Sequence, residues 1–209
     1  MNIPIIYEDD WLLVVDKPSG LLVIPTPHNE KRTLTTILND DLKLKSCNYR
    51  LHPCHRLDRE TSGLIIYAKG KSAQNKMMDE FKNRHVHKTY IAFVHGVLPL
   101  GSRSINTKVD GKSALTNYSV VEQRKNFTCL KVNPATGRKN QIRIHFKGIG
   151  HPLVGESRFS FRKDYALKAK RALLHAYALD FIHPWKNKRI HLESALPQDM
   201  VSLLIKDNA

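Results

Sequence analysis

Short apolar runs of strand length, separated by polar turns, constrain the fold of this chain more than any other feature of its sequence. The longest unbroken run is Gly63–Ala68, and other strand-like segments lie at Ile5–Tyr7, Leu12–Val15, Leu21–Ile24, Tyr90–Val94, Asn117–Val121, Thr128–Val132 and Arg189–Leu192. These segments outnumber the helical ones and do not alternate with them regularly. The pattern predicts a mixed α+β fold around an antiparallel or mixed sheet, and it argues against a Rossmann arrangement.

Helical spacing of apolar residues predicts three helices. Thr33–Leu42 is the first, and Pro197–Ile205 is a terminal helix with proline in its first turn. Ser72–Lys82 is the second, with Ser72 as N-cap and a buried stripe of Ala73, Met77, Met78 and Phe81. Asn140–Phe146 fits either an alternating strand or a short helix, and polar Gly101–Gly111 predicts a loop or an edge.

The composition is that of a globular protein with a large basic surplus. The 209 residues include 34 Lys and Arg against 19 Asp and Glu, a net charge of +15, and 41% are hydrophobic. No apolar run approaches the roughly 20 residues that span a bilayer, and the N-terminus has no signal pattern. The three cysteines form no readable disulfide framework. We therefore expect a reduced, cytoplasmic protein.

The positive charges recur along the whole chain instead of forming one tail. This spread favours a folded basic face, for which nucleic acid is the commonest polyanionic partner, although a basic surface that serves only solubility fits the composition too. The chain has no GxGxxG, P-loop, CxxC or HExxH motif. His52-Pro53-Cys54-His55 reads as a structural turn, because no second cluster has metal-ligand spacing. No cofactor and no metal are predicted.

The segment His55–Gly63, directly before the longest apolar run, is dense in polar groups. Asp58 lies between Arg56 and Arg59, whose charges favour its ionised form. Such a carboxylate in a basic cleft can serve as nucleophile or base. The same residues also fit a turn in which Asp58 accepts backbone hydrogen bonds near Thr61 or Ser62, and the local pattern does not separate the two.

The string HRLDRETSGLIIYAK at His55–Lys69 resembles the signature of the RluA family of RNA pseudouridine synthases. Further segments are similar to the family's in the same order: Tyr7–Leu21, Arg84–Gly96, Thr136–His145 with Gly150-His151-Pro152, and Arg171–Ala176 with His183-Pro184. The resemblance covers essentially the whole chain. It implies a pseudouridine synthase catalytic fold: a mixed, mainly antiparallel, bisected sheet with flanking helices and loops, and a central RNA-binding cleft.

The resemblance also implies a function. The protein would isomerise a uridine in 23S ribosomal RNA or transfer RNA to pseudouridine, with neither cofactor nor metal. Residues 1–209 would form one catalytic domain, acting as a monomer without the separate N-terminal RNA-binding domain of many relatives. Recognition would then fall to the catalytic domain, and stem-loop RNA is the expected partner because unpaired bases are easier to extrude.

Three catalytic residues are carried over from the family pattern. Asp58 would be the essential carboxylate, Tyr90 would lie against the uracil, and Arg143 would pair with Asp58. Leu174 would be an apolar wall of the pocket. Each of the last three has a plainer alternative: a sheet-core aromatic for Tyr90, a surface phosphate contact for Arg143 and core packing for Leu174.

The remaining predicted site residues contact RNA. Arg56 would fill the place of the flipped base, since its planar guanidinium can stack as a base does. Arg138 and Lys139 would hold phosphates, and Thr61 would belong to the substrate site beside Asp58.

The chain departs from the family pattern at Lys139-Asn140, commonly Thr-His, and at Gly155-Glu156, commonly Gly-Asp. We expect both departures to touch neighbours of Arg143 and not Arg143 itself, and so to affect substrate preference more than activity.

Two other functions fit parts of the sequence. A non-catalytic RNA-binding or ribosome-assembly protein could keep the fold, but it would tolerate loss of Asp58, and Asp58, Tyr90 and Arg143 are all present. A nuclease would need clustered acidic metal ligands, which the carboxylates of the N-terminal region do not form in sequence.

Overall fold

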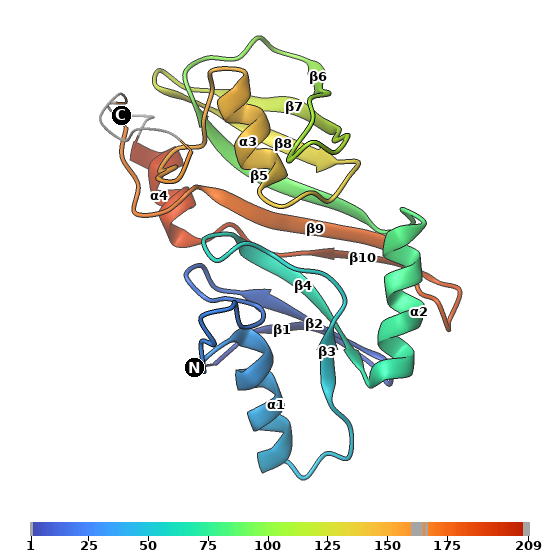
Figure 1. The fold of residues 1–209 in the computed structure, drawn as a ribbon. Helices are drawn as coiled ribbons and strands as arrows, with labels where there is room; N and C mark the ends of the chain where they lie inside the picture. Colours follow the sequence, from blue (N-terminus) through green and yellow to red (C-terminus); the bar gives the residue numbers. More distant parts are fainter. Residues whose placement is uncertain (1, 160–164, 166, 207–209) are drawn as a thin grey trace. The chain divides into compact units, whose positions relative to one another are not determined.

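The computed structural model describes residues 2–159, 165 and 167–206, and within them the chain is a mixed α+β protein (Figure 1). Its strands are β1 (Ile5–Glu8), β2 (Leu12–Lys17), β3 (Leu51–Pro53), β4 (Ser62–Lys69), β5 (His87–His95), β6 (Ser102–Ile105), β7 (Thr116–Gln123), β8 (Phe127–Pro134), β9 (Leu174–Ile182) and β10 (Arg189–Glu193). Its helices are α1 (Leu34–Leu44), α2 (Lys71–Lys82), α3 (Gln141–Gly148) and α4 (Gln198–Lys206). The predicted α+β class with a mainly antiparallel sheet is confirmed. The bisected form of the sheet and the RNA-binding cleft stay predictions.

The chain divides into two compact units. The first unit comprises Met1–His87 and Ala178–Ser194, and the second comprises Lys88–Tyr177 and Ala195–Ala209. The expectation that residues 1–209 act as one catalytic domain stays a prediction. No helix in the described part of the chain is long and apolar enough to cross a membrane.

The first unit is built around β4. Strand β2 pairs with it antiparallel from Leu12↔Ala68 to Lys17↔Gly63, and β3 pairs with its C-terminal end, so that Ala68 has strand partners on both sides. Such a central strand is buried on every side, which explains its unbroken apolar sequence. Side chains of β2, β4 and α2 form the core of this unit, with Leu12, Ile66 and Met77 fully buried.

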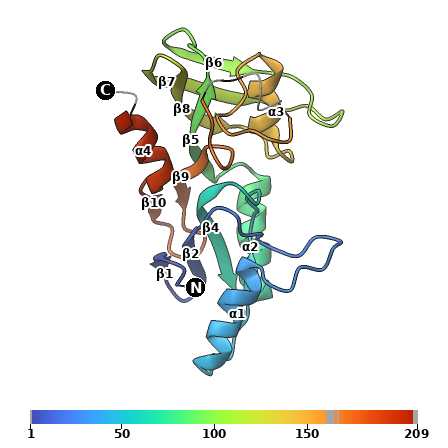
Figure 2. The same cartoon turned by 90° about the vertical axis from the view of Figure 1, so that its left-hand side faces the viewer.

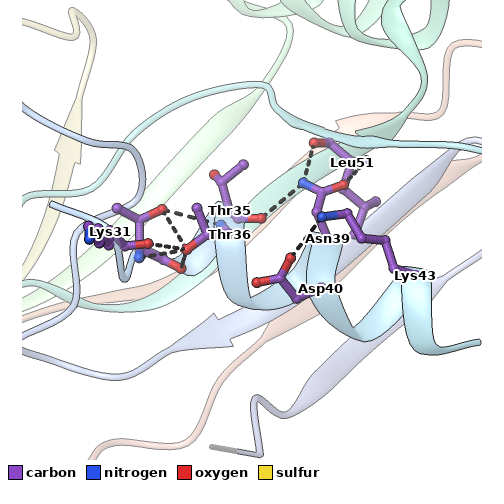
Figure 3. Close-up of polar contacts among 8 residues, drawn as sticks. Lys31, Thr35, Thr36, Asn39, Asp40, Lys43 and Leu51 are labelled. Carbon is purple, nitrogen blue, oxygen red and sulfur yellow. Dashed lines mark hydrogen bonds and ion pairs between the residues drawn. The ribbon is translucent and has the colours of Figure 1, made fainter. Parts of the chain in front are cut away.

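Helix α1 is fastened to β3 by one buried amide (Figure 3). The helix begins with a capping box in which Thr33 and Thr36 bond reciprocally. Asn39 donates from Nδ2 to the carbonyls of Thr35 (2.9 Å) and Leu51 (3.1 Å), and its Oδ1 accepts from the Leu51 N–H (2.9 Å). The amide thus satisfies both backbone groups of Leu51, at the start of the strand that leads to Asp58.

The second unit contains an antiparallel sheet with strand order β5-β8-β7-β6. Strands β6, β7 and β8 pair in succession, β5 pairs with β8, and β6 is an edge strand. Its core contains Phe93, Phe127 and Leu173, with Met200 of α4 fully buried against them. Helix α3 lies against β7 (Figure 2). There the rings of Phe146 and Tyr118 pack edge to face, with their centroids 5.2 Å apart. The apolar side chains of Asn140–Phe146 therefore belong to a helix and not to a strand.

Two predictions at α2 are wrong. The N-cap is Gly70, at φ +98° and without a side-chain cap bond, and Ser72 lies inside the helix. Met78 is 47% exposed. Residues 73, 77 and 81 follow a spacing of four, whereas residue 78 is turned about 100° from residue 77. On the face of α2 that carries Met78, the buried residue is Gln74, one turn earlier. Its amide donates to the Pro53 carbonyl at 2.8 Å.

The segment Leu21–Ile24, expected to resume extended chain, is not part of a strand. The carbonyls of Leu22 and Val23 instead accept from the N–H groups of Leu34 and Thr35, at 2.8 and 3.1 Å. These are donors of the first turn of α1 that have no partner inside the helix. The segment therefore serves as a backbone cap for α1. The described edge strand β6 agrees with the loop or edge predicted at Gly101–Gly111.

Candidate active site

Asp58 lies in the turn that connects β3 to β4, in the first unit. The chain leaves β3 through Cys54, whose N–H donates to the carbonyl of Ile66 at 2.9 Å. The Ile66 N–H donates to Nε2 of His55 at 3.0 Å, and the Asp58 carbonyl accepts from the Thr61 N–H at 3.1 Å. The turn expected from the sequence is present, and it closes through the main-chain carbonyl of Asp58.

A buried lysine organises the same turn from the neighbouring strand. Lys17 ends β2, is completely buried, and pairs with Gly63 at the start of β4. Its ammonium donates to three carbonyl oxygens, those of Pro18 at 2.9 Å, Leu21 at 2.8 Å and Arg59 at 3.2 Å. A buried ammonium needs such acceptors, and these lie on both the 18–21 turn and the Asp58 turn.

The 18–21 turn and the Asp58 turn are also joined directly. The Gly20 N–H donates to the Arg59 carbonyl at 2.8 Å, and Nε of Arg59 donates back to the Gly20 carbonyl at 3.1 Å. The Ser19 hydroxyl donates to the Glu60 carbonyl at 2.8 Å. Both residues that follow Asp58 are therefore held through their backbone, which limits the directions open to the Asp58 side chain.

Burial alternates across the residues around Asp58. Leu57 is 5% exposed and anchors the turn, whereas Arg56 before it is exposed and Asp58 after it is half-buried. Thr61 is buried at 3% exposure. An exposed arginine two residues before Asp58 can reach a nucleic acid, so the arrangement is compatible with the role predicted for Arg56.

Tyr90 lies in β5 of the second unit, where it pairs with Val132 and is 9% exposed. The start of this strand is held by Asn133, whose amide donates to the Lys88 carbonyl at 3.2 Å and the Thr89 hydroxyl at 2.8 Å. Burial lowers the pKa of Lys88. Both the catalytic and the sheet-core readings of Tyr90 predict a buried strand position, so its contact with uracil stays a prediction.

Arg143 is a buried residue of α3 that binds a carboxylate within its own unit. Its Nε donates to Oε2 of Glu156 and its Nη2 donates to Oε1, both at 2.7 Å. Arg143 is 5% exposed and Glu156 is 3% exposed. The alternative reading of Arg143 as a surface phosphate contact is wrong, because its guanidinium is buried and already takes part in a bidentate ion pair. The predicted pairing with Asp58 stays a prediction.

Glu156 is in turn held by the backbone that follows it. Its Oε1 accepts from the N–H groups of Arg158 at 2.8 Å and Phe159 at 3.3 Å. Burial alone would raise the pKa of Glu156, but the hydrogen bonds from Arg143 and Arg158 lower it below its ordinary value. The expectation that the Gly155-Glu156 departure leaves Arg143 untouched is wrong, because folding makes Glu156 the direct partner of that arginine.

The loop before α3 is organised by Gln141. Its Oε1 accepts from the Thr136 hydroxyl at 2.7 Å and the Arg138 N–H at 3.0 Å, and its amide donates to the Leu115 carbonyl at 3.0 Å. Asn140 precedes the helix at φ +54°, a left-handed conformation that asparagine tolerates well.

The two residues predicted to hold phosphates lie on this loop. Arg138 and Lys139 are both exposed, which their predicted role requires. Nε of Arg138 donates to the Ser113 carbonyl at 3.0 Å, so part of this side chain is already bound within the protein.

Leu174 opens β9 and is 4% exposed. Its carbonyl accepts from Arg171, whose guanidinium forms a two-point ion pair with Asp199 of α4 at 2.6 and 2.9 Å. A buried leucine fits both a pocket wall and ordinary core packing, so the predicted role of Leu174 is not decided by its burial.

The predicted residues fall into two groups. Asp58, Arg56 and Thr61 belong to the first unit, whereas Tyr90, Arg138, Lys139, Arg143 and Leu174 belong to the second. Among the described residues, no three His, Cys, Asp or Glu side chains are grouped so that they could hold a metal ion.

Residues 11–147 match the family model described as RNA pseudouridylate synthase. The chain belongs to this family. The match contains the Asp58 turn, Tyr90 and Arg143, and the enzymes of the RNA pseudouridylate synthase family are isomerases.

Curated relatives agree with the RluA type predicted from the sequence. The uncharacterized RNA pseudouridine synthase YlyB of Bacillus subtilis is 34% identical over 98% of this chain and 72% of its own length. The ribosomal large subunit pseudouridine synthase D of Nitrosomonas europaea is 36% identical over 96% of this chain. This chain spans 64% of that relative's length.

A solved member of the RNA pseudouridylate synthase family has the same fold. Human RNA pseudouridylate synthase domain containing 4 superposes with a TM-score of 0.81 at 25% identity, covering 98% of this chain and 93% of that chain.

Three residues that contact the predicted site residues, or the turns that carry them, were not predicted from the sequence. Lys17 had a signal, since a lysine that ends an apolar strand directly before a Pro-Ser-Gly turn is a candidate for a buried ammonium. Gln141 was noted only as part of a segment similar to the family's, and Glu156 only as a departure from the family pattern. The sequence did not indicate their partners, because folding alone brings those partners within reach.

Proposed function

We propose that this protein isomerises a uridine of a structured RNA to pseudouridine, with Asp58 as its essential carboxylate. The observation that carries the proposal is the Asp58 turn, which is held by Lys17 and by the 18–21 turn within a chain that belongs to this family. A carboxylate on an anchored turn, followed by a buried strand, is a preorganised reactive group.

The reaction rearranges one nucleotide. The glycosidic bond to nitrogen-1 of uracil breaks, the base turns within the pocket, and carbon-5 bonds to the ribose. Carbon-5 loses its proton and nitrogen-1 gains one, so the atoms balance without another reactant. Asp58 would attack the ribose, attack the ring or remove a ribose proton, and Tyr90 would lie against the uracil and assist the proton at carbon-5.

The substrate proposed here is ribosomal RNA of the large subunit. The support is the printed name of several relatives, ribosomal large subunit pseudouridine synthase. Extrusion of the target base costs a few kcal/mol, which Arg56 would offset by stacking in its place. Arg138 and Lys139 would bind phosphates without reading sequence.

The test is release of tritium from RNA that carries uridine labelled at carbon-5. The protein should release it from large-subunit ribosomal RNA without added metal or nucleotide. Release from transfer RNA alone would support the proposed isomerisation but would identify transfer RNA, not ribosomal RNA, as the substrate. Release from neither RNA would contradict the proposal and favour a non-catalytic RNA-binding protein.

The role of Asp58 is tested by Asp58→Asn, with Asp41→Asn on the exposed face of α1 as the matched control. Asp58→Asn should bind RNA within about threefold of the wild type and release no tritium, since one carboxylate can supply several kcal/mol of barrier reduction. Asp41→Asn should keep full activity. Turnover near the wild-type rate in Asp58→Asn would remove this residue from its proposed role.

A further inference from the structure

The guanidinium of Arg143 is held along one edge by a carboxylate of the same unit. Glu156 takes the Nε and Nη2 donors, each at 2.7 Å and each on a different carboxylate oxygen. Two parallel hydrogen bonds fix the plane of a guanidinium as well as its position. The orientation of the Nη1 edge is therefore set by Glu156.

Glu156 itself has little freedom to move. Its carboxylate accepts two backbone N–H groups, those of Arg158 and Phe159, and its own N–H donates to the Leu153 carbonyl at 3.0 Å. Gly155 before it has φ +81°, and a β-carbon there would overlap the Arg171 carbonyl. Only glycine fits this approach of two backbone segments, so the residue that carries the carboxylate is fixed on both sides.

The ring of Phe159 is a second group that holds the Arg143 guanidinium, beside the Glu156 carboxylate. The central carbon of the guanidinium lies 5.4 Å from the centre of that ring, within the range of a cation–π contact. The guanidinium thus contacts the Phe159 ring, while Glu156 holds its Nε–Nη2 edge. Glu156 remains ionised in this buried place because its hydrogen bonds outweigh the effect of burial on its pKa.

A flexible arginine side chain needs contacts that fix its guanidinium if it is to act at a reaction centre. Arginine loses substantial rotamer entropy when it is fixed, and a misplacement of about 1 Å at a catalytic group can cost about 100-fold in rate. Helix α3 has only eight residues and positions the Cα of Arg143, but it does not determine the orientation of the guanidinium.

We infer that Glu156 is a positioning residue for the isomerisation, acting by fixing the guanidinium of Arg143 through its Nε–Nη2 edge. The inference rests on the proposed function and on the predicted pairing of Arg143 with the essential carboxylate of Asp58. It adds a residue that sequence comparison with the family pattern treats only as a departure. The carboxylate is the required feature, so aspartate should replace it better than glutamine.

The experiment measures tritium release by full-length Glu156→Gln and Glu156→Asp. Glu156→Gln should lower kcat by about 10- to 100-fold while KM for the RNA changes less than about twofold. Glu156→Asp should recover kcat to within about fivefold of the wild type. The matched control is Glu122→Gln, the same change at a glutamate that pairs with Arg124 at 2.6 Å in the same unit, and it should keep the wild-type kcat.

An Arg143→Ala background separates positioning from general stability. Glu156→Gln should lower kcat no further there, because the group through which it acts is gone. A kcat loss of equal size in both backgrounds would overturn the inference. So would Glu156→Gln with the wild-type kcat, or Glu156→Asp no better than Glu156→Gln.

A measurement on the wild-type protein covers the case in which Glu156→Gln does not fold. The Nε–H signal of Arg143 in a ¹⁵N NMR spectrum, assigned by its loss in Arg143→Lys, should exchange slowly with water. Rapid exchange would overturn the inference. Failure of the proposed function looks different: the wild type would then release no tritium from either RNA, whatever the state of Arg143.

Discussion

At the scale of single residues, Lys17 shows how a buried charge can shape a site that it does not itself form. Its ammonium is completely buried and bonds to three carbonyls, one of them 42 residues along the chain at Arg59. Hydrogen bonds from a charged donor stabilise by about 1.5–3 kcal/mol each, and acceptors left without a donor carry a penalty of similar size. The charge therefore couples the stability of the unit to the shape of the Asp58 turn.

Lys17→Met, which keeps the length of the side chain and removes the ammonium, should lower the free energy of unfolding by about 2–4 kcal/mol. It should also lower the rate of tritium release, since the Arg59 carbonyl loses its partner. Urea unfolding followed by circular dichroism measures the first effect. Lys43→Met, at a lysine whose side chain is 78% exposed, is the control. Equal unfolding midpoints for the two variants would show that the three hydrogen bonds contribute little.

At the scale of elements, one buried side chain determines how α1 meets β3. Asn39 imitates a strand neighbour, because its amide satisfies both the N–H and the carbonyl of Leu51 (Figure 3). Strand β3 has only three residues, too few to be stable from pairing with β4 alone. The helix therefore supports the strand that leads into the Asp58 turn.

Asn39→Ala should lower the free energy of unfolding by about 2 kcal/mol, because it leaves buried backbone groups of Leu51 without partners. Hydrogen exchange at the Leu51 N–H should become faster in the folded protein. Asn75→Ala, at an exposed position of α2, should change neither quantity. An unchanged exchange rate at Leu51 in Asn39→Ala would contradict the role given to this amide.

At the scale of the whole molecule, buried titratable groups in both units make folding depend on pH. Burial lowers the pKa of His95, and it lowers that of His145 and His183 more than their acceptor and ion-pair contacts raise it. Hydrogen bonds also hold the pKa of Glu156 and Asp199 below their ordinary values, against the opposing effect of burial. Each group binds fewer protons folded than unfolded, so acidification favours the unfolded chain.

The urea midpoint should thus be level above about pH 7, fall as the pH drops through about 6.5, and fall further below about 4.5 when the carboxylates titrate. A series of unfolding curves from pH 8 to pH 4 measures this. His28→Gln, at an exposed histidine, should leave the profile unchanged, and His145→Gln should flatten its upper part. A midpoint that rises on acidification would contradict the assignment of neutral buried histidines.

The fold was predictable from sequence wherever the signal was local. Apolar runs and turn residues located the strands β1, β2, β4, β5, β7, β8 and β10, and helical spacing located α1, α2 and α4. The short β3 was missed because three residues carry no periodicity, and Asn140–Phe146 was undecided because both periods fit it. The structure shows a helix there, and in this helix Phe146 packs against Tyr118.

By itself the sequence determined the α+β class, the family and the residues expected to carry the chemistry, because strings such as HRLDRETSG are read along the chain. Only the tertiary structure decided which groups hold those residues. One partner of Arg143 is 13 positions away at Glu156, and one acceptor of Lys17 is 42 positions away at Arg59. A buried charge must find a partner, and folding, not spacing along the chain, determines which partner is within reach.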